Sequence, residues 1–234
     1  MGRSLRAAES GLVYHVLNRG NARRPLFFKE GDYAAFLRVL TEAKQEVPMR
    51  LLAYGVMPNH WHLLLWPDEG QNLSRFVGWL TLTHTQRWHA YYHDVGSGHL
   101  YQGRFKSFPV AEDERFLIVC RYVERNAVRA GLVARVQDWP WGSPWLRHHD
   151  PHGAAALLSP WPVERPAVWE EFVNAPQTEA ELQAVRQCVQ RGRPFGNPDW
   201  VERSAARLGL AQTLRPRGRP RKRRPRDSAE ATLL

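Results

Sequence analysis

His60 and His62, which bracket a tryptophan, are the residues in this sequence whose types and spacing best suit metal chemistry. They open the apolar run 60–66, directly after the turn-forming pair Pro58-Asn59. Residues two apart in a β-strand point to the same face, so the two imidazoles would project together while Trp61 enters the opposite face. Two imidazoles directed at one point could form half of a metal site. The competing interpretation is two tolerated polar residues on a half-exposed strand.

A second set of reactive side chains lies on a predicted helix that begins at Glu112 or Asp113 and ends near Asn126. Its core positions are Phe116, Val119, Cys120 and Val123. Residues four apart are neighbours on one helix surface, so Tyr122 and Asn126 could point into one site. Three arginines share the same four-residue spacing: Arg121, Arg125 and Arg129. The helix therefore offers a hydroxyl, an amide and a row of cations.

The elements that must position these groups follow a regular order. Alternating apolar residues predict strands over 12–19, 51–56 and 104–110, in addition to the strand that holds the histidines. Apolar residues at helical spacing predict helices over 30–47 and from Asn72 to the glycine-rich segment 96–98. The order β-α-β-β-α-β predicts an α+β fold, a ferredoxin-like antiparallel sheet with packed helices.

The sequence pattern after residue 137 predicts a helical extension at the C-terminal end of the domain. From Gln137 to Pro162 the composition shifts to Trp, Pro, Gly and His, which we interpret as irregular chain that packs aromatic rings onto the domain. Thr178 and Glu181 form a capping-box pattern for a helix that ends at Gly192. Asn197-Pro198 predicts the start of a second helix, to Leu208. The two helices could form a helix-turn-helix-like unit or a hairpin packed on the body.

Charge is concentrated at one end of the 234-residue chain, whose formal net charge is +10. Eight of the 33 Lys and Arg residues lie between Arg215 and Arg226 without an acidic residue, so the remaining 25 nearly balance the 23 Asp and Glu. This predicts a disordered basic tail. Only two cysteines are present, in no metal or redox pattern, and no apolar run is long enough for a membrane span. We expect a cytoplasmic protein, associated with the nucleoid when bound to DNA.

Four segments in order carry a resemblance to a known family: Tyr14–Asn21, Met57–Leu64, Gly98–Ser107 and Arg121–Val133. Together they resemble the successive motifs of REP-associated tyrosine transposases, single-tyrosine HUH enzymes of the IS200-like superfamily. The resemblance covers about residues 11 to 147. One departure is Ala127, where the family commonly has proline after the asparagine.

The resemblance implies that His60, His62 and Asn126 bind a divalent metal, Mg²⁺ or Mn²⁺, and that Tyr122 is the nucleophile. Such a metal would polarise a scissile phosphate and offset its charge. A free tyrosine hydroxyl has a pKa of about 10 and needs activation by metal, base or cation. Attack on phosphorus would leave the 5′ phosphate on the tyrosine and release a 3′ hydroxyl. Other tyrosines that compete for this role are Tyr91, Tyr92 and Tyr101.

The function implied is a DNA transposase that cleaves and rejoins single-stranded or hairpin DNA. The alternatives are a non-catalytic hairpin-binding module and a metal-dependent nuclease that uses water. Residues expected to contact DNA in the body are Arg19, Arg104, Lys106, Arg121, Arg125 and Arg129. The tail resembles an AT hook for A·T-rich duplex, with contacts from Arg217, Arg219 and Arg221; a solvated basic tail is the other interpretation.

The expected domain organisation has four parts. They are a transposase domain (1–147), a Trp/Pro-rich wrap or linker (148–176), a two-helix extension (177–210) and the basic AT-hook-like tail (211–234). A monomer and a homodimer both fit the sequence, because the tyrosine helix could serve its own subunit or a partner.

Overall fold

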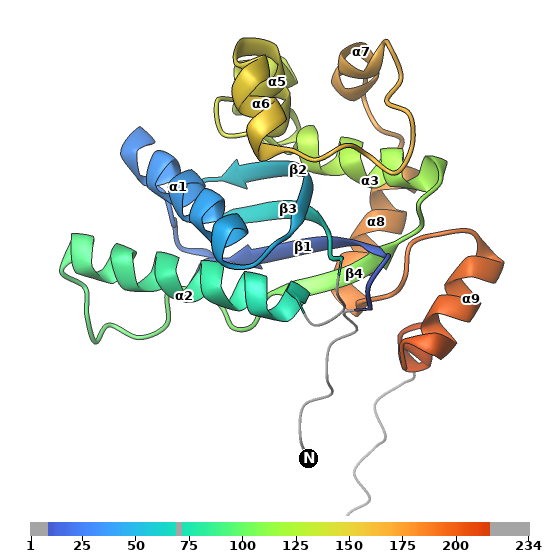
Figure 1. The fold of residues 1–234 in the computed structure, drawn as a ribbon, viewed down its shortest axis with the longest axis horizontal. Helices are drawn as coiled ribbons and strands as arrows, with labels where there is room; N and C mark the ends of the chain where they lie inside the picture. The colour runs from blue at the N-terminus through green and yellow to red at the C-terminus, as the bar shows by residue number, and fades with distance from the viewer. Residues whose placement is uncertain (1–8, 69–71, 216–234) are drawn as a thin grey trace, which may run out of the picture.

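The computed structural model describes residues 9–68 and 72–215 of the chain (Figure 1). The elements, with η for 3₁₀ turns, are β1 (Val13–Arg19), η1 (Asn21–Arg23), α1 (Glu30–Glu46), β2 (Arg50–Met57), β3 (His60–Trp66), α2 (Asn72–Tyr92), β4 (Lys106–Val110), α3 (Glu114–Glu124), α4 (Asn126–Arg129), η2 (Val136–Asp138), α5 (Ser143–His149), α6 (Pro151–Leu157), α7 (Trp169–Asn174), α8 (Glu179–Arg191), α9 (Pro198–Arg207) and η3 (Ala211–Thr213).

The four strands form one antiparallel sheet in the order β2-β3-β1-β4. With α1 between β1 and β2, and α2 between β3 and β4, this confirms the predicted ferredoxin-like β-α-β-β-α-β arrangement. The histidine strand β3 is central, so its backbone is hydrogen-bonded on both sides. His62 pairs with Leu17 of β1 and Gly55 of β2, which fixes the height and direction of its side chain.

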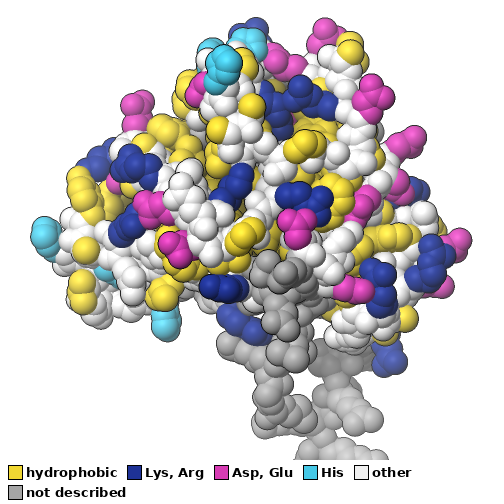
Figure 2. All heavy atoms as spheres, in the orientation of Figure 1, with side chains coloured by type: hydrophobic (Ala, Val, Ile, Leu, Met, Phe, Trp, Pro, Cys, Tyr) yellow, Lys and Arg dark blue, Asp and Glu magenta, His cyan; other side chains and the backbone are white. Residues whose placement is uncertain are grey.

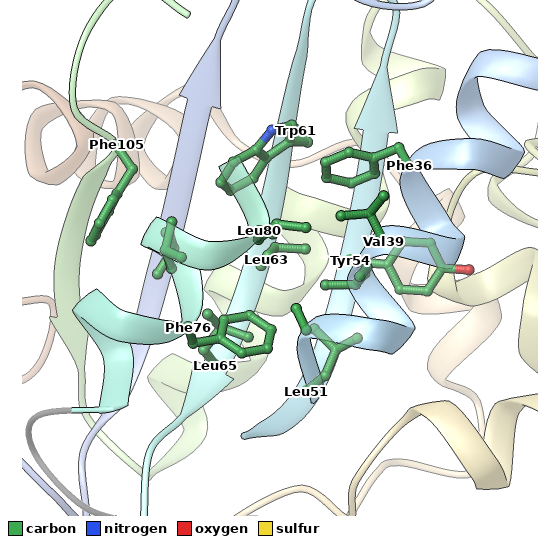
Figure 3. Packing of buried hydrophobic residues seen from close by; sticks show 14 of the residues in the cluster. Phe36, Val39, Leu51, Tyr54, Trp61, Leu63, Leu65, Phe76, Leu80 and Phe105 are labelled. Carbon is green, nitrogen blue, oxygen red and sulfur yellow. The ribbon is translucent and has the colours of Figure 1, made fainter. Parts of the chain in front are cut away.

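One face of the sheet is covered by α1 and α2 (Figure 1). The helices and β3 interlock through fully buried apolar side chains (Figure 3): Phe36 and Val39 from α1, Phe76 and Leu80 from α2, and Trp61, Leu63 and Leu65 from β3. These β3 positions alternate with His60, His62 and Leu64, as a strand requires. Burial of Trp61, Leu63 and Leu65 on this face therefore directs the two histidines to the other face.

The opposite face of the sheet is covered by α3 and by the C-terminal extension. The second core cluster combines Phe116, Val119 and Val123 of α3 with Val173 of α7 and Val185 of α8. Gly55 of β2 permits the close approach of α3, because a Cβ atom there would lie 3.0 Å from the carbonyl oxygen of Val123. α8 also packs against β4. The extension thus shares a core with the sheet, which favours packing on the body over a separate helix-turn-helix unit.

The predicted ends of α8 and α9 agree with the structure. Thr178 and Glu181 form the capping box of α8, and Gly192 ends it in the left-handed conformation at φ +70°. The Asn197 side chain accepts a hydrogen bond from the Trp200 N–H at the start of α9.

The prediction of irregular chain between Gln137 and Pro162 is wrong, because α5 and α6 lie there. Each is seven residues long with proline in its first turn, where the missing N–H costs nothing. The aromatic wrap itself is present: the indoles of Trp139 and Trp161 donate to the β2 carbonyls of Val56 and Leu52. The segment after Pro162 also contains a helix, α7, which the sequence pattern does not predict.

The surface of the body carries both signs of charge. On the face that Figure 2 shows, Lys and Arg side chains are interspersed with Asp and Glu and do not form one continuous basic patch. No helix among the described residues combines the length and the apolar character that a bilayer crossing requires. The predicted AT-hook residues Arg217, Arg219 and Arg221 lie outside the described residues.

Candidate active site

His60 and His62 lie side by side at the start of β3, on the face of the sheet that packs against α3. Their ring centroids are 5.0 Å apart and the rings are nearly perpendicular, at 86°. Trp61 points to the other face, where its indole N–H donates to the hydroxyl of Tyr101 at 3.1 Å. The two-residue spacing therefore brings the imidazoles together, as the sequence predicts.

Each histidine uses Nδ1 for a contact with a neighbouring side chain. Nδ1 of His62 lies 2.9 Å from Nε2 of His15, which is fully buried in β1. Nδ1 of His60 lies 2.7 Å from Oδ1 of Asn59 in the β2–β3 turn. These contacts fix the ring orientations and leave Nε2 as the remaining nitrogen of each ring. His15 is thus a supporting residue of the site, a role that the sequence did not decide.

Burial keeps this group of imidazoles neutral. It lowers the pKa of His15 to about 3. Burial, followed by the charges of Arg19 and Arg129, lowers the pKa of His60 to about 4. The pKa of His62 is also lowered, first by burial and then by the neighbouring His15 and His60. At neutral pH each ring therefore has a nitrogen lone pair, which metal binding requires.

Tyr122 and Asn126 reach the histidines from the end of α3. The predicted single helix is interrupted: α3 ends at Glu124, Arg125 takes φ −82° and ψ 2°, and Asn126 begins the short α4. The two side chains nevertheless face the same site. Asn126 Nδ2 lies 3.1 Å from His60 Nε2, and the Tyr122 ring centroid lies 5.9 Å from that of His62. One chain thus supplies all four groups.

The donor set suits a divalent metal, although it contains no carboxylate. Among the described residues, no three His, Cys, Asp or Glu side chains gather as a metal-binding group. The candidate set is instead two neutral imidazoles and one amide, which leaves coordination positions for phosphate oxygens. Because such a set binds hard cations weakly by itself, a phosphate ligand would add to occupancy.

A pocket of about 770 Å³ opens beside these residues. Its lining includes His60, His62 and Tyr122, together with four cationic side chains, Arg19, Arg23, Arg104 and Lys106. Three of these cations were predicted to contact DNA, and the structure brings them to the histidines. Polar lining residues that were not predicted are Asn18, Asn59, Gln102 and Gln190. Gln102 lies within the Gly98–Ser107 motif, so the sequence could have identified it as a site residue. Gln190 comes from α8, outside the four motifs, and no sequence pattern indicates it.

The structure does not place the row of helix arginines on that lining. Arg121 is buried, with its guanidinium 4.0 Å from the Phe172 ring centroid, and donates to the carbonyls of Ala175 and Pro176. Arg129 lies over Tyr122, 4.2 Å from the ring centroid. Arg125 is half-buried, and within the described part of the chain its NH1 has no hydrogen-bond partner. Arg121 in particular is occupied by residues 172–176, which argues against a role in holding DNA phosphates.

The other tyrosines considered as nucleophiles lie elsewhere. Tyr101 is buried on the opposite face of the sheet, between Trp61 and His84. Its hydroxyl accepts from the Trp61 indole and lies 2.7 Å from Nδ1 of His84. Tyr91 and Tyr92 are on α2, where they contact Lys29 and Asp32. Among the described tyrosines, Tyr122 is the one that lines the pocket with the histidines.

Comparisons with known proteins agree with this geometry. The family model described as "Transposase IS200 like" matches residues 8–126. A curated REP-associated tyrosine transposase from Escherichia coli (strain K12) is 22% identical over 139 residues, which cover 58% of this chain and 77% of that protein. A solved REP-associated tyrosine transposase bound to a REP hairpin has 21% identity and a TM-score of 0.51, covering 70% of this chain and 94% of that one. The structural likeness shows a common fold.

Proposed function

Because this chain belongs to the IS200-like transposase family, we propose that it cleaves and rejoins single-stranded DNA through a covalent bond to Tyr122. Family membership implies an enzyme that cuts and rejoins DNA and suggests a divalent metal. The observation that carries the finer proposal is the convergence of Tyr122 from α3, Asn126 from α4, and His60 and His62 from the distant strand β3. A structural packing role alone would not gather a phenol, two neutral imidazoles and an amide beside a cationic pocket.

In the proposed reaction, the Tyr122 oxygen attacks the phosphorus of the scissile phosphodiester. The bond from phosphorus to the 3′ oxygen breaks, so that Tyr122 carries the 5′ phosphate of one fragment. The phenol loses its proton and the released 3′ oxygen gains one, so charge is balanced. Since the phosphodiester energy is kept in the phosphotyrosine, a 3′ hydroxyl can reverse the step and rejoin strands.

His60, His62 and Asn126 would hold the metal ion, Mg²⁺ or Mn²⁺. When bound, the ion would polarise the scissile phosphate and offset charge that develops in the transition state. His15 and Asn59 keep the two imidazoles in place through their Nδ1 contacts. This support from the protein orients both rings before DNA arrives.

Arg19, Arg23, Arg104 and Lys106 would bind the DNA backbone in the same pocket. Cations contact phosphates without reading sequence, and so they orient the strand over Tyr122. A hairpin substrate is suggested by the REP hairpin bound to the solved relative. We therefore propose a single strand next to a hairpin as the DNA form that this pocket accepts.

The test uses the full-length protein with Mg²⁺ or Mn²⁺ and a hairpin with a single-stranded extension. A 3′-end label should become attached to protein, whereas a 5′-end label should leave as a shorter fragment with a 3′ hydroxyl. Tyr122→Phe should abolish the adduct, and Tyr91→Phe on α2 should leave it unchanged. Cleavage without adduct would indicate a nuclease that uses water. Binding without cleavage would indicate a recognition module.

The tail would add affinity for A·T-rich duplex DNA. Its Arg-Gly-Arg-Pro core, residues 217–220, matches an AT hook, in which arginines enter a narrow and electronegative minor groove. Full-length protein carrying Arg217→Ala and Arg219→Ala should lose preference for A·T-rich over G·C-rich duplex while still forming the Tyr122 adduct. Equal loss for both duplexes would mean that the tail makes only unspecific phosphate contacts.

A further inference from the structure

Arg129 links the proposed nucleophile to the proposed metal ligand. Its NH2 donates to Oδ1 of Asn126 at 2.7 Å, and both terminal nitrogens lie 3.3 Å from the carbonyl oxygen of Tyr122. The guanidinium carbon is 4.2 Å from the Tyr122 ring centroid, and NH1 also contacts Oε1 of Gln177 at 3.4 Å. The side chain is thus committed to contacts inside the site.

These contacts decide which end of the Asn126 amide faces the histidines. A guanidinium can only donate hydrogen bonds, so the amide must present its oxygen to Arg129. The amide nitrogen then faces His60, with Nδ2 3.1 Å from Nε2. A hard divalent cation binds the oxygen of an amide, not its nitrogen. In this arrangement Asn126 therefore presents the wrong end to the metal.

From this geometry we infer that Arg129 and the divalent cation compete for the oxygen of Asn126. To offer its oxygen beside His60, the amide must turn over, which would point Nδ2 at the Arg129 guanidinium, donor against donor. Turning the amide breaks its charged hydrogen bond to Arg129, so metal binding by the Asn126 oxygen releases Arg129 from Asn126. The inference rests on the proposed function, because it takes Asn126 to be a metal ligand.

Arg129 also raises the local positive charge, and this effect must be separated from the amide contact. Burial lowers the pKa of Arg129, the Tyr122 hydroxyl acts in the opposite direction, and the charges of Arg186 and Arg125 lower it further. Removing any of these arginines would ease the approach of a cation. Arg186 is a matched control, because its charge acts on Arg129 while its side chain pairs with Glu179, at 3.4 Å, on α8.

The experiment measures Mn²⁺ affinity of the full-length protein without DNA, by electron paramagnetic resonance or calorimetry. Arg129→Met keeps apolar packing over Tyr122 and should bind Mn²⁺ about tenfold more tightly than wild type, because the competing charged hydrogen bond is gone. Arg186→Met should stay within about threefold of wild type, since it removes charge at a distance. Equal or weaker Mn²⁺ binding by Arg129→Met, or the same gain in both variants, would overturn the inference.

A second measurement on the wild type does not depend on how the variant folds. In a titration with Mg²⁺, the side-chain NMR signal of Arg129 Nε should shift as the guanidinium leaves Asn126. An unchanged signal, or no ion binding by either protein, also contradicts the competition. Cleavage is judged separately: a wild type that forms the Tyr122 adduct without this competition keeps the proposed function and loses only this inference. If Arg129 and the ion compete but no Tyr122 adduct forms, the inference holds and the proposed function is wrong.

Discussion

Tyr122 and Glu124 are two residues apart in α3, and each is the centre of a buried polar cluster of a different kind. The Glu124 side chain is fully buried, and both carboxylate oxygens have partners. Oε1 accepts from the Ser143 hydroxyl at 2.8 Å and from Arg147 at 2.6 Å, and Oε2 accepts from the Trp169 indole at 2.8 Å. This cluster is closed.

The cluster around Tyr122 is open. Nδ1 of the fully buried His15 has no hydrogen-bond partner among the residues that the structure describes, the Asn126 nitrogen faces an imidazole, and the cluster borders a cationic pocket. Buried polar groups without partners cost stability. Such groups are expected mainly at functional sites, where a bound molecule supplies the missing partner. The comparison teaches that burial and polarity alone do not identify a site; what distinguishes the two clusters is whether the protein satisfies its own groups.

The largest effect that would sharpen this comparison is expected from His60→Ala. Loss of one proposed ligand should lower single-turnover DNA cleavage by about 1,000-fold, since metal stabilisation of the transition state amounts to several kcal/mol. The free energy of unfolding should change by only about 1 kcal/mol, because His60 lies at the open end of the cluster. Denaturant unfolding and cleavage are measured on the same preparation, with His148→Ala on the exposed surface as control. Cleavage at the wild-type rate would remove His60 from the site.

In the closed cluster around Glu124, a substitution should reduce stability more than it reduces DNA cleavage. Glu124→Ala should lower the free energy of unfolding by about 3–5 kcal/mol, because it leaves the largely buried guanidinium of Arg147 without its carboxylate. Pairing Glu124→Met with Arg147→Met should recover part of this loss, since no unpaired charge then remains. Urea titration of the wild type and the two variants measures both effects. Folded Glu124→Ala protein that loses cleavage as strongly as His60→Ala would break the distinction between the clusters.

The sequence predicts the open cluster better than the closed one, for a physical reason. His60 and His62 follow from strand periodicity, and Tyr122 and Asn126 follow from helix periodicity; both patterns are local. The meeting of these elements came from the family resemblance. The closed cluster depends on Arg147 and Trp169, which reach Glu124 across 23 and 45 residues of chain. No local pattern encodes such pairings.

The arginines show the same limit. Arg121 and Arg129 share a helix surface in the sequence, yet Arg121 binds carbonyls in the 175–176 segment and Arg129 binds Asn126. A pattern of cations cannot reveal whether carbonyls elsewhere in the chain already use them. The missed helices α5 and α6 have another cause: a segment rich in Trp, Pro, Gly and His predicts irregular chain, although Pro144 and Pro151 sit in first turns, where proline is favoured.

The smallest predicted effect concerns His84, a buried histidine on the other face of the sheet whose Nδ1 lies 2.7 Å from the Tyr101 hydroxyl. Burial lowers its pKa to about 4, against a small opposing effect of Asp32. Below pH 6.5 the unfolded chain takes up a proton that folded His84 does not, so stability falls as the pH drops from about 6.5 toward about 4 and is unaffected above this range.

For this one group the loss should be about 2 kcal/mol between pH 7 and pH 5. His84→Gln keeps an acceptor for Tyr101 without a titrating ring, and so its unfolding free energy should fall less over that interval, with cleavage unchanged at pH 7. An identical pH dependence in both proteins would place the acid sensitivity elsewhere. Loss of cleavage in His84→Gln would mean that the Trp61–Tyr101–His84 contacts keep β3 in the position that catalysis requires. A buried polar group on the other face of the sheet would then also support the active site.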